Sequence, residues 1–346
     1  MTDFRPTATL AALRARAALT ARLRTFFAER EYLEVETPAL SADVVVDAHI
    51  EPLRTRVHPD PAAADRDAPG RFVPRFLQTS PEFHLKRLVA AGYGSVWNLS
   101  RVFRDGEIGA RHNPEFTMAE WYGVGPGRDG WRDQVRVTEA LIRSLSDGPT
   151  DGAAGTPEPF ETLTYDEAFE RFAGTAVLGL SAADLFTLAR DRGVGLPGGL
   201  ENDRDGLLNV LLAELVEPNL GTAATGGPCF LCDYPASQSA LATVRADPGR
   251  PAVAERFELY ADGVELCNGY QELTDAGELR DRIARQNALR AAHGLAPLPA
   301  DSRLLAAMEH GLPRCSGVAL GFDRLVMRLT GQSRLDAVIA FPHGVA

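Results

Sequence analysis

Lysine is almost absent from this chain of 346 residues. Lys86 is the only one, and the other 35 of the 36 basic residues are arginine. The Gly-Lys pair of a Walker A loop is therefore missing, which excludes a P-loop nucleotide site. If the protein binds a nucleoside triphosphate, arginine and metal ions must hold the phosphates, a task that suits the bidentate guanidinium group.

Cysteine is scarce as well, since the chain has four. Four cysteines in a chain of this length are too few for a disulfide framework, so we expect reduced thiols. Cys229 and Cys232 have the spacing of half a zinc site or of a redox pair, but no second pair follows them. Residues three apart on a strand face opposite sides. The sequence therefore favours structural thiols.

Long apolar runs and an excess of positive charge are also missing. No run reaches the roughly 18 apolar residues of a membrane span, and residues 1–5 lack the order of a signal peptide. We therefore expect a cytoplasmic protein with no membrane partner. The formal net charge of −11 disfavours a long polyanion held by bulk electrostatics. With 45% hydrophobic residues, the chain can still bury a large core.

The hydrophobic pattern predicts interspersed helices and strands in one domain of residues 1–346. We expect helices at 9–30, 181–216 with a break near 193–199, 279–293 and 322–329, and strands at 32–38, 95–104, 115–122, 229–231, 256–260, 264–267 and 317–321. Residues 59–70 and 146–159 should be exposed loops. The pattern indicates an α+β fold on a mostly antiparallel sheet flanked by helices, with a helical insertion at about 165–220.

Residues 125–130 match the G-x-G-x-x-G pattern of dinucleotide-binding proteins and precede a predicted helix. Pro126 has no N–H to offer a pyrophosphate, and the following helix leads into a linker where a βαβ unit needs its second strand. The sequence therefore favours a plain turn over a dehydrogenase site.

The segment between the two predicted strands at 95–104 and 115–122 carries the strongest functional signal. It brings basic, acidic and aromatic side chains together, and Asn113-Pro114-Glu115-Phe116 leads straight into an apolar strand. A solvated loop is the alternative, but this arrangement favours a positioned site. Residues 96–122 resemble motif 2 of the class II aminoacyl-tRNA synthetases, in which a Phe-Arg strand and a loop are followed by a strand that opens with Phe.

Two further segments are similar to the remaining motifs of that class. Residues 315–330 resemble motif 3, and residues 9–40, with a helix and a strand that ends at Pro38, resemble motif 1. Within the class, residues 81–88, 112–122 and 265–275 look like the lysyl type. The similar segments cover nearly the whole chain and follow one another in the same order as in the family, which excludes a coincidental match.

Departures from the lysyl type narrow the resemblance. The catalytic part begins almost at Met1, so we expect no anticodon-binding domain. Segments 79–84, 103–107, 234–242 and 315–321 resemble the truncated lysyl-tRNA synthetase paralogues that attach lysine to elongation factor P. In that family the preferred amino acid is (R)-β-lysine.

The resemblance implies an ATP-dependent ligase. An amino-acid carboxylate attacks the α-phosphorus of ATP, which requires positioning and charge neutralisation and no general base. Arg104 and Arg324 are the expected catalytic residues, the first on the α-phosphate and the second over the adenine opposite Phe116. The implied ATP-binding set is Arg104, Glu107, Arg111, His112, Asn113, Phe116, Glu258, Leu266, Gly321 and Arg324. Many synthetases have a glutamate at the position of Gly106, and here Glu107 is its possible substitute.

Two carboxylates, Glu258 and Glu265, resemble those that bind the Mg²⁺ bridging the phosphates. An exposed strand charge is the alternative for Glu258. Because a buried ammonium needs an anion, the substrate's amino groups also require carboxylates, with Glu272 expected on the side-chain ammonium and Glu82 on the other. The implied substrate-binding set is Ser80, Glu82, Glu120, Tyr122, Asn268, Tyr270, Glu272 and Ala319. A salt-bridge role is the alternative for Glu120, and lysyl-tRNA synthetases usually have glycine at the position of Ala319.

The expected partners follow from the same resemblance. The helix at 9–30 carries an apolar stripe of Leu19, Leu23, Phe26 and Phe27 that we expect to need a second subunit, as in a class II homodimer. The expected acceptor is elongation factor P and not tRNA, held by a local basic patch. Its candidates are the motif 2 loop arginines together with Arg54, Arg56, Arg71 and Arg75, for which solvated surface charge is the alternative. A lysyl-type paralogue that charges tRNA or a small amine, and an inactive regulatory paralogue, are the alternatives.

Overall fold

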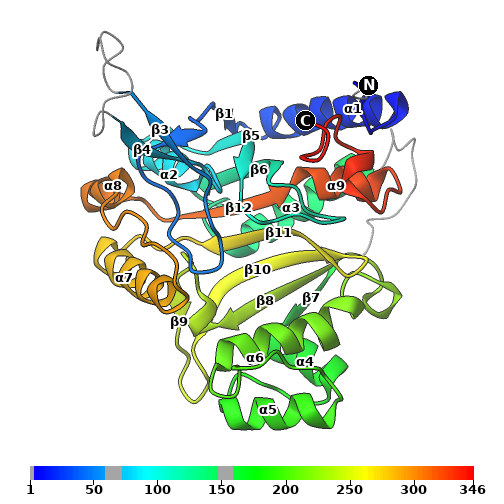
Figure 1. The fold of residues 1–346 in the computed structure, drawn as a ribbon, viewed down its shortest axis with the longest axis vertical. Coiled ribbons are helices and arrows are strands. Elements are labelled where there is room, and N and C mark those ends of the chain that lie inside the picture. Colours follow the sequence, from blue (N-terminus) through cyan, green and yellow to red (C-terminus); the bar gives the residue numbers. More distant parts are fainter. Residues whose placement is uncertain (1–3, 59–71, 147–158) are drawn as a thin grey trace.

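The computed structural model describes residues 4–58, 72–146 and 159–346 (Figure 1). The loops expected at 59–70 and 146–159 lie, apart from the ends of the second, outside the described residues, and so does Arg71. Among the described helices, none is long and apolar enough to cross a bilayer.

A nine-stranded sheet runs through the centre of the described molecule (Figure 1). Its strands follow the order β1 (Leu33–Glu34), β5 (Val96–Phe103), β6 (Glu115–Val124), β12 (Cys315–Gly321), β11 (Val264–Gln271), β10 (Val253–Ala261), β8 (Cys229–Pro235) and β7 (Glu161–Thr164), with β9 (Val244–Arg245) paired to β10 off this path. Among the described pairings of this sheet, the outermost two, β1 with β5 and β7 with β8, are parallel and the rest antiparallel. The expected α+β fold is confirmed.

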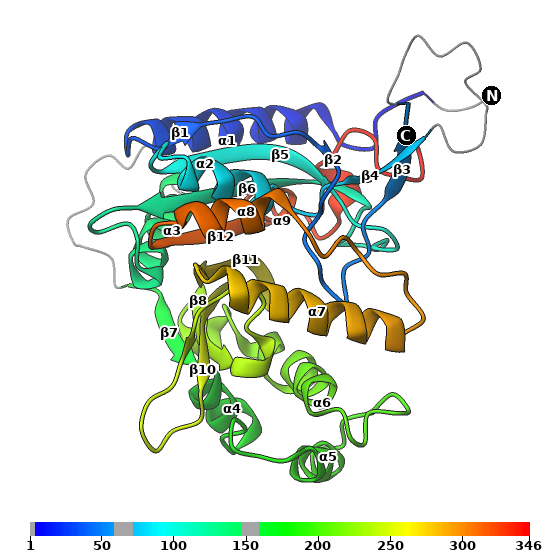
Figure 2. The same cartoon turned by 90° about the vertical axis from the view of Figure 1, so that its left-hand side faces the viewer.

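Helices cover both faces of this sheet. α1 (Leu10–Ala28), α3 (Trp131–Ser146) and α9 (Phe322–Leu329) share one hydrophobic core with the sheet. α2 (Glu82–Ala90), α7 (Ala276–Ala292) and α8 (Arg303–Gly311) form another core and lie in front of the sheet in Figure 2. A separate sheet has the order β2 (Leu40–Ser41), β4 (Val73–Leu77) and β3 (Arg54–Val57).

The predicted helical insertion forms a layer around β7 and β8. It contains α4 (Tyr165–Ala173), α5 (Ala182–Asp191) and α6 (Arg204–Leu211), the last continued by a π-helical turn, Leu212–Val216. Capping boxes start α4 at Thr164 and α5 at Ser181, because each hydroxyl accepts a bond from the third amide of its helix. The predicted break falls between α5 and α6.

Helix α1 begins where Thr9 accepts a hydrogen bond from the amide of Ala12. Its apolar stripe is buried within the chain, with the ring of Phe27 stacked 4.6 Å from that of Trp97 and next to Trp121. The expectation that this stripe needs a second subunit is therefore wrong, because β5, β6 and α3 already cover it.

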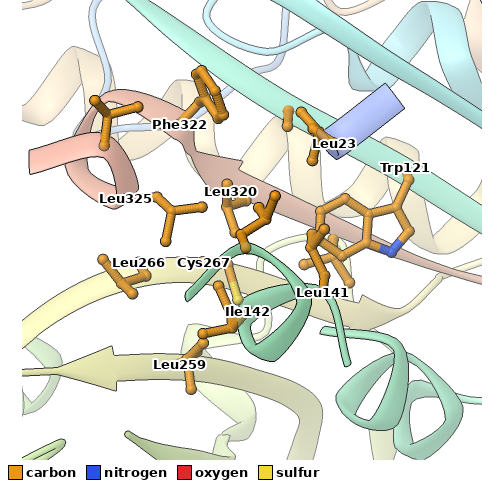
Figure 3. Packing of buried hydrophobic residues seen from close by; sticks show 14 of the residues in the cluster. Leu23, Trp121, Leu141, Ile142, Leu259, Leu266, Cys267, Leu320, Phe322 and Leu325 are labelled. Atoms are coloured by element: carbon orange, nitrogen blue, oxygen red, sulfur yellow. The ribbon is translucent and has the colours of Figure 1, made fainter. Parts of the chain in front are cut away.

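Alternation along the strands places most core side chains on one face of the sheet. Trp121, Leu320, Cys267 and Leu259 point toward α1, α3 and α9 in the core (Figure 3). Since successive side chains of a strand face opposite sides, the residues between them point to the other face of the sheet. That face carries the candidate site.

Two sequence patterns are explained by this fold. Residues 125–130 form a turn between β6 and α3, with positive φ at Gly125 and Gly127, and both neighbours of β6 are antiparallel to it, which confirms the turn and excludes a βαβ unit. Cys229 and Cys232 are free and buried in different cores on opposite faces of β8. Burial raises the pKa of both thiols to about 12, so they are inert structural thiols, as expected.

Candidate active site

A cavity of about 860 Å³ lies between the sheet, α2, α7 and the loop before β3. Every residue predicted for the ATP, metal and substrate sites lines it. These residues are Ser80, Glu82, Arg104, Glu107, Arg111, His112, Asn113, Phe116, Glu120, Tyr122, Glu258, Glu265, Leu266, Asn268, Tyr270, Glu272, Ala319, Gly321 and Arg324. The structure thus brings the whole predicted set together, while the role of each residue stays a prediction.

Antiparallel pairing arranges the floor of the cavity in rows. Glu120 of β6 is paired with Ala319 of β12, Ala319 with Asn268 of β11, and Asn268 with Glu258 of β10. The next row contains Tyr122, Gly317, Tyr270 and Arg256. Because neighbouring strands are about 4.8 Å apart, residues distant in sequence line one continuous surface. Ala319 lies between Glu120 and Asn268, so a methyl group there narrows the floor.

Three buried carboxylates, Glu82, Glu120 and Glu272, form one end of the cavity, which we call the amine pocket. Glu120 accepts hydrogen bonds of 2.8 Å from the hydroxyls of Ser80 and Tyr122, one on each oxygen. Burial, followed by repulsion from Glu82, raises the pKa of Glu120 to about 8. Such a pocket attracts ammonium groups, because a buried carboxylate loses its hydration and an opposite charge beside it offsets that cost.

The absence of a side chain at Gly317 shapes this pocket. A Cβ atom at this position would collide with the Glu272 carboxylate and the Tyr122 ring. Glycine therefore allows both side chains to approach the backbone of β12.

A cation behind the amine pocket was missed by the sequence analysis. The Lys86 ammonium lies 2.5 Å from Glu82 Oε1 and 2.5 Å from Glu272 Oε2, and the residue is 1% exposed. The spacing of Glu82 and Lys86 by four residues on α2 is the signal that could have revealed one of these pairs.

The other end of the cavity is rich in arginine. The guanidinium of Arg104 lies 5.1 Å from the ring centre of Phe116 and 3.6 Å from the Glu107 carboxylate. Its buried Nε has no hydrogen-bond partner among the described residues. An unpaired buried donor is costly, so an anionic ligand such as a phosphate or carboxylate fits here.

Arg324 joins motif 3 to the motif 2 loop. Its Nη2 lies 2.8 Å from His112 Nε2, and its Nη1 donates to the Glu265 carbonyl at 3.0 Å. Burial and the charge of Arg324 lower the pKa of His112, which keeps the imidazole neutral. The contact to the Phe116 ring comes from Arg104, and the stacking of adenine between Phe116 and Arg324 stays a prediction.

Asn113 occupies a structural position at the rim. Its amide donates to the Glu115 carbonyl at 2.6 Å, and its oxygen accepts from the His343 amide at 2.8 Å. Gly106 has a φ of +77°, which disfavours any L side chain. The turn thus disfavours a glutamate at 106, and Glu107 is the carboxylate that faces Arg104.

Glu258 is held by a buried network. Its Oε1 accepts from Arg256, and its Oε2 accepts from the hydroxyls of Tyr234 at 2.6 Å and Tyr260 at 2.7 Å. Glu265 is half-buried in the cavity wall, and the loss of hydration there, together with the charge of Glu258, raises the pKa of Glu265 to about 7. The negative charges of Glu258 on β10 and Glu265 on β11 therefore repel each other.

This donor set fits a magnesium ion that also binds phosphate. The described residues contain no cluster of three or more His, Cys, Asp or Glu side chains that could hold a metal alone. Mg²⁺ is usually bound by one or two carboxylates together with substrate phosphates. Glu265 has a free carboxylate edge, and Oε1 of Glu258 keeps one acceptor position beside Arg256.

Comparison with known proteins agrees with this geometry. Residues 1–344 match the family described as tRNA synthetases class II (D, K and N). The chain is 44% identical to the elongation factor P–(R)-β-lysine ligase of Sodalis glossinidius over 339 residues, which is 98% of this chain and 97% of that protein. It is 42% identical to the ligase of the same name from Vibrio vulnificus over 344 residues, 99% of each chain. The chain therefore belongs to the class II tRNA synthetase family of the D, K and N type.

Proposed function

We propose that the protein activates lysine or (R)-β-lysine with ATP and transfers it to a lysine side chain of elongation factor P. The observation that carries this proposal is one cavity with three buried carboxylates at one end and, at the other, the Nε of Arg104, which has no partner in the described part of the chain. Such a cavity fits an amino acid with two ammonium groups beside a nucleotide. The names of relatives that match over their whole length support elongation factor P as the acceptor.

The first step joins the amino acid to AMP. The substrate carboxylate attacks the α-phosphorus, the acyl-phosphate bond forms, and the bond to pyrophosphate breaks. Arg104 neutralises the charge that develops on the α-phosphate, and Arg324 lies over the adenine with Phe116 on the opposite side. Glu107, Arg111, His112 and Asn113 surround the nucleotide, as do Leu266 and Gly321. Mg²⁺, when bound by Glu258 and Glu265, neutralises charge on the phosphates.

The amine pocket holds the two ammonium groups. Glu272 receives the side-chain ammonium and Glu82 the one nearer the carboxylate, while Ser80 and Tyr122 orient Glu120. Asn268 donates to the Tyr270 hydroxyl at 2.7 Å and stands beside Ala319 in the floor. The methyl group of Ala319 lies between Glu120 and Asn268 and reduces the space there, and in this way it selects between lysine isomers.

In the second step the acceptor's neutral amine attacks the carbonyl carbon of the adenylate. An amide bond forms, AMP leaves, and the amine gives up its proton. An acceptor protein must be held locally, because the net charge of −11 provides no bulk attraction for a polyanion. Exposed Arg56 and half-buried Arg75 on β3 and β4 are candidates, whereas Arg54 is engaged by Glu51 at 3.0 Å.

Label transfer tests the choice of acceptor. Incubation with ATP, Mg²⁺ and radiolabelled lysine or (R)-β-lysine should label elongation factor P and leave tRNA unlabelled, with more product from (R)-β-lysine. ATP–pyrophosphate exchange under the same conditions separates activation from transfer. Label on tRNA with none on the protein factor contradicts the acceptor, and absence of exchange with every lysine isomer contradicts the adenylate chemistry.

A pH effect follows from Glu120. The carboxyl is neutral below its pKa of about 8 and anionic above it, and only the anion pairs with an ammonium group. The KM for the amino acid should therefore fall as the pH rises from 6.5 to 8.5, and amino-acid binding at pH 7 should release protons. Calorimetry in two buffers of different ionisation enthalpy measures the release. Equal heats in both buffers contradict this prediction.

We also propose a cytoplasmic homodimer. Leu10, Leu33 and Leu40 of the motif 1 segment are exposed apolar residues that a second copy could cover. Light scattering at micromolar concentration should give twice the monomer mass of 37.3 kDa. The monomer mass alone at this concentration contradicts the dimer. The need for ATP and four buried free thiols fit a cytoplasmic location.

A further inference from the structure

Lys86 stands behind the wall of the amine pocket. It does not line the cavity, whereas its two partners Glu82 and Glu272 do. Its ammonium also lies 6.0 Å from the ring centre of Tyr122. The ammonium therefore reaches a substrate only through these two carboxylates.

Lys86 contacts one oxygen of each of the two carboxylates. Lys86 binds Oε1 of Glu82 and Oε2 of Glu272, and the other oxygen of each remains for a ligand or a backbone amide. When bound substrate keeps all three carboxylates ionised, these carboxylates and the Lys86 ammonium have a formal charge of −2, which two substrate ammonium groups neutralise. Without Lys86 the three negative charges would outnumber the two ammonium groups, which favours protonation of one carboxyl.

We propose that Lys86 is a positioning residue that fixes Glu82 and Glu272 and sets the charge of the amine pocket to match a substrate with two ammonium groups. This inference rests on the proposed lysine-type substrate. Lys86 thus contributes to substrate selectivity through Glu82 and Glu272, although it does not line the cavity itself.

Electrostatics agree with this geometry. Although burial alone lowers the pKa of an ammonium, the carboxylates of Glu272 and Glu82 raise the pKa of Lys86 above its ordinary value, so the side chain stays charged. Burial raises the pKa of Glu272 to about 7 against the lowering effect of Lys86. Loss of the ammonium thus moves carboxylate ionisation to higher pH. The titratable groups that interact with Lys86 are Glu82 on α2, Tyr122 on β6, Glu272 just after β11 and Cys315 on β12. Glu120 and Tyr270 act on Glu82 and Glu272 and not on Lys86 itself.

The wild-type protein permits a direct test, because it contains one lysine. Selective ¹³C labelling of lysine gives a single NMR signal for the Cε atom, which is bonded to Nζ. The signal should remain that of an ammonium at a pH where an ordinary lysine, with a pKa of about 10.4, has titrated, and it should shift when lysine is added. Titration near the ordinary value overturns the proposal, whether or not the protein proves to act on elongation factor P.

Two variants test selectivity. In Lys86→Met, the KM for the amino acid should rise about tenfold at pH 7, and the pH at which it levels off should move up by about one unit, as expected for loss of a close opposite charge. Preference for lysine over its uncharged isostere 6-hydroxynorleucine should fall, while the KM for ATP stays unchanged. Lys86→Arg retains the charge and should keep the wild-type pH profile and preference.

The contrast between these variants decides the matter. A merely structural role lowers activity in both without moving the pH profile or the preference, and that result overturns the proposal. If Lys86→Met does not fold, the NMR titration of the wild-type chain still decides whether the ammonium holds the two carboxylates.

Discussion

Replacing Arg104 by alanine should lower kcat/KM for ATP–pyrophosphate exchange by about 10³-fold, the usual effect of removing a charged group that stabilises phosphoryl transfer. The buried Nε of Arg104 has no partner among the described residues, and its other contacts are the Glu107 carboxylate and the Phe116 ring. The side chain therefore contributes little to the fold. The loss should appear in kcat, with an unchanged melting temperature.

Arg101, on β5 three residues before Arg104, provides the matched control. Its guanidinium lies 3.6 Å from Glu115 in an ion pair whose side chains are both 51% exposed, and it does not line the cavity. Because exposed pairs contribute little, Arg101→Ala should keep exchange within about twofold of the wild-type rate. An Arg104→Ala variant as active as Arg101→Ala would remove Arg104 from the catalytic set.

Much of the fold was predictable because apolar segments bounded by turn residues mark its longer strands. In β12, Val318 and Leu320 face the core and Ala319 between them lines the cavity, so the period of a strand helps to place site residues on one face. The register across the sheet could not be predicted, since it depends on pairing between distant segments. The rows that set Ala319 between Glu120 and Asn268 were therefore seen only in the structure.

Helix α2 and its lysine show why the rest could not be predicted. α2 begins without a side-chain cap, and it buries Glu82 and Lys86, which a sequence pattern assigns to the surface. The partner that stabilises this burial, Glu272, belongs to another part of the chain. The short strands β2, β3 and β4 were missed because each is only two to five residues long.

Replacing Glu265 by glutamine should cost at least about 100-fold in exchange at limiting Mg²⁺, because a ligand of the ion that neutralises the phosphates is lost. Because the pKa of Glu265 is about 7, the expected effect depends on pH. The carboxyl gains its charge as the pH rises through 7, so the wild-type Mg²⁺ requirement should fall between pH 6 and pH 8. In Glu265→Gln this pH dependence should be absent, and higher Mg²⁺ should restore part of the activity.

Glu255→Gln is the control for this variant. Glu255 lies on the same strand as Glu258, accepts from the Thr243 hydroxyl at 2.8 Å, and does not line the cavity. It should leave the Mg²⁺ requirement unchanged. An identical requirement in Glu265→Gln and Glu255→Gln would overturn the metal assignment of Glu265.

Glu258→Gln should separate metal binding from stability. Glu258 is the charge partner of Arg256 and accepts from Tyr234 and Tyr260, so its neutralisation leaves a largely buried guanidinium without an anion. Breaking such a pair costs about 3 kcal/mol of unfolding free energy. Denaturant unfolding should therefore show a clear loss for Glu258→Gln and none for Glu265→Gln, whose side chain is 39% exposed. Equal stability of the two variants would mean that the Arg256 network does not depend on the charge of Glu258.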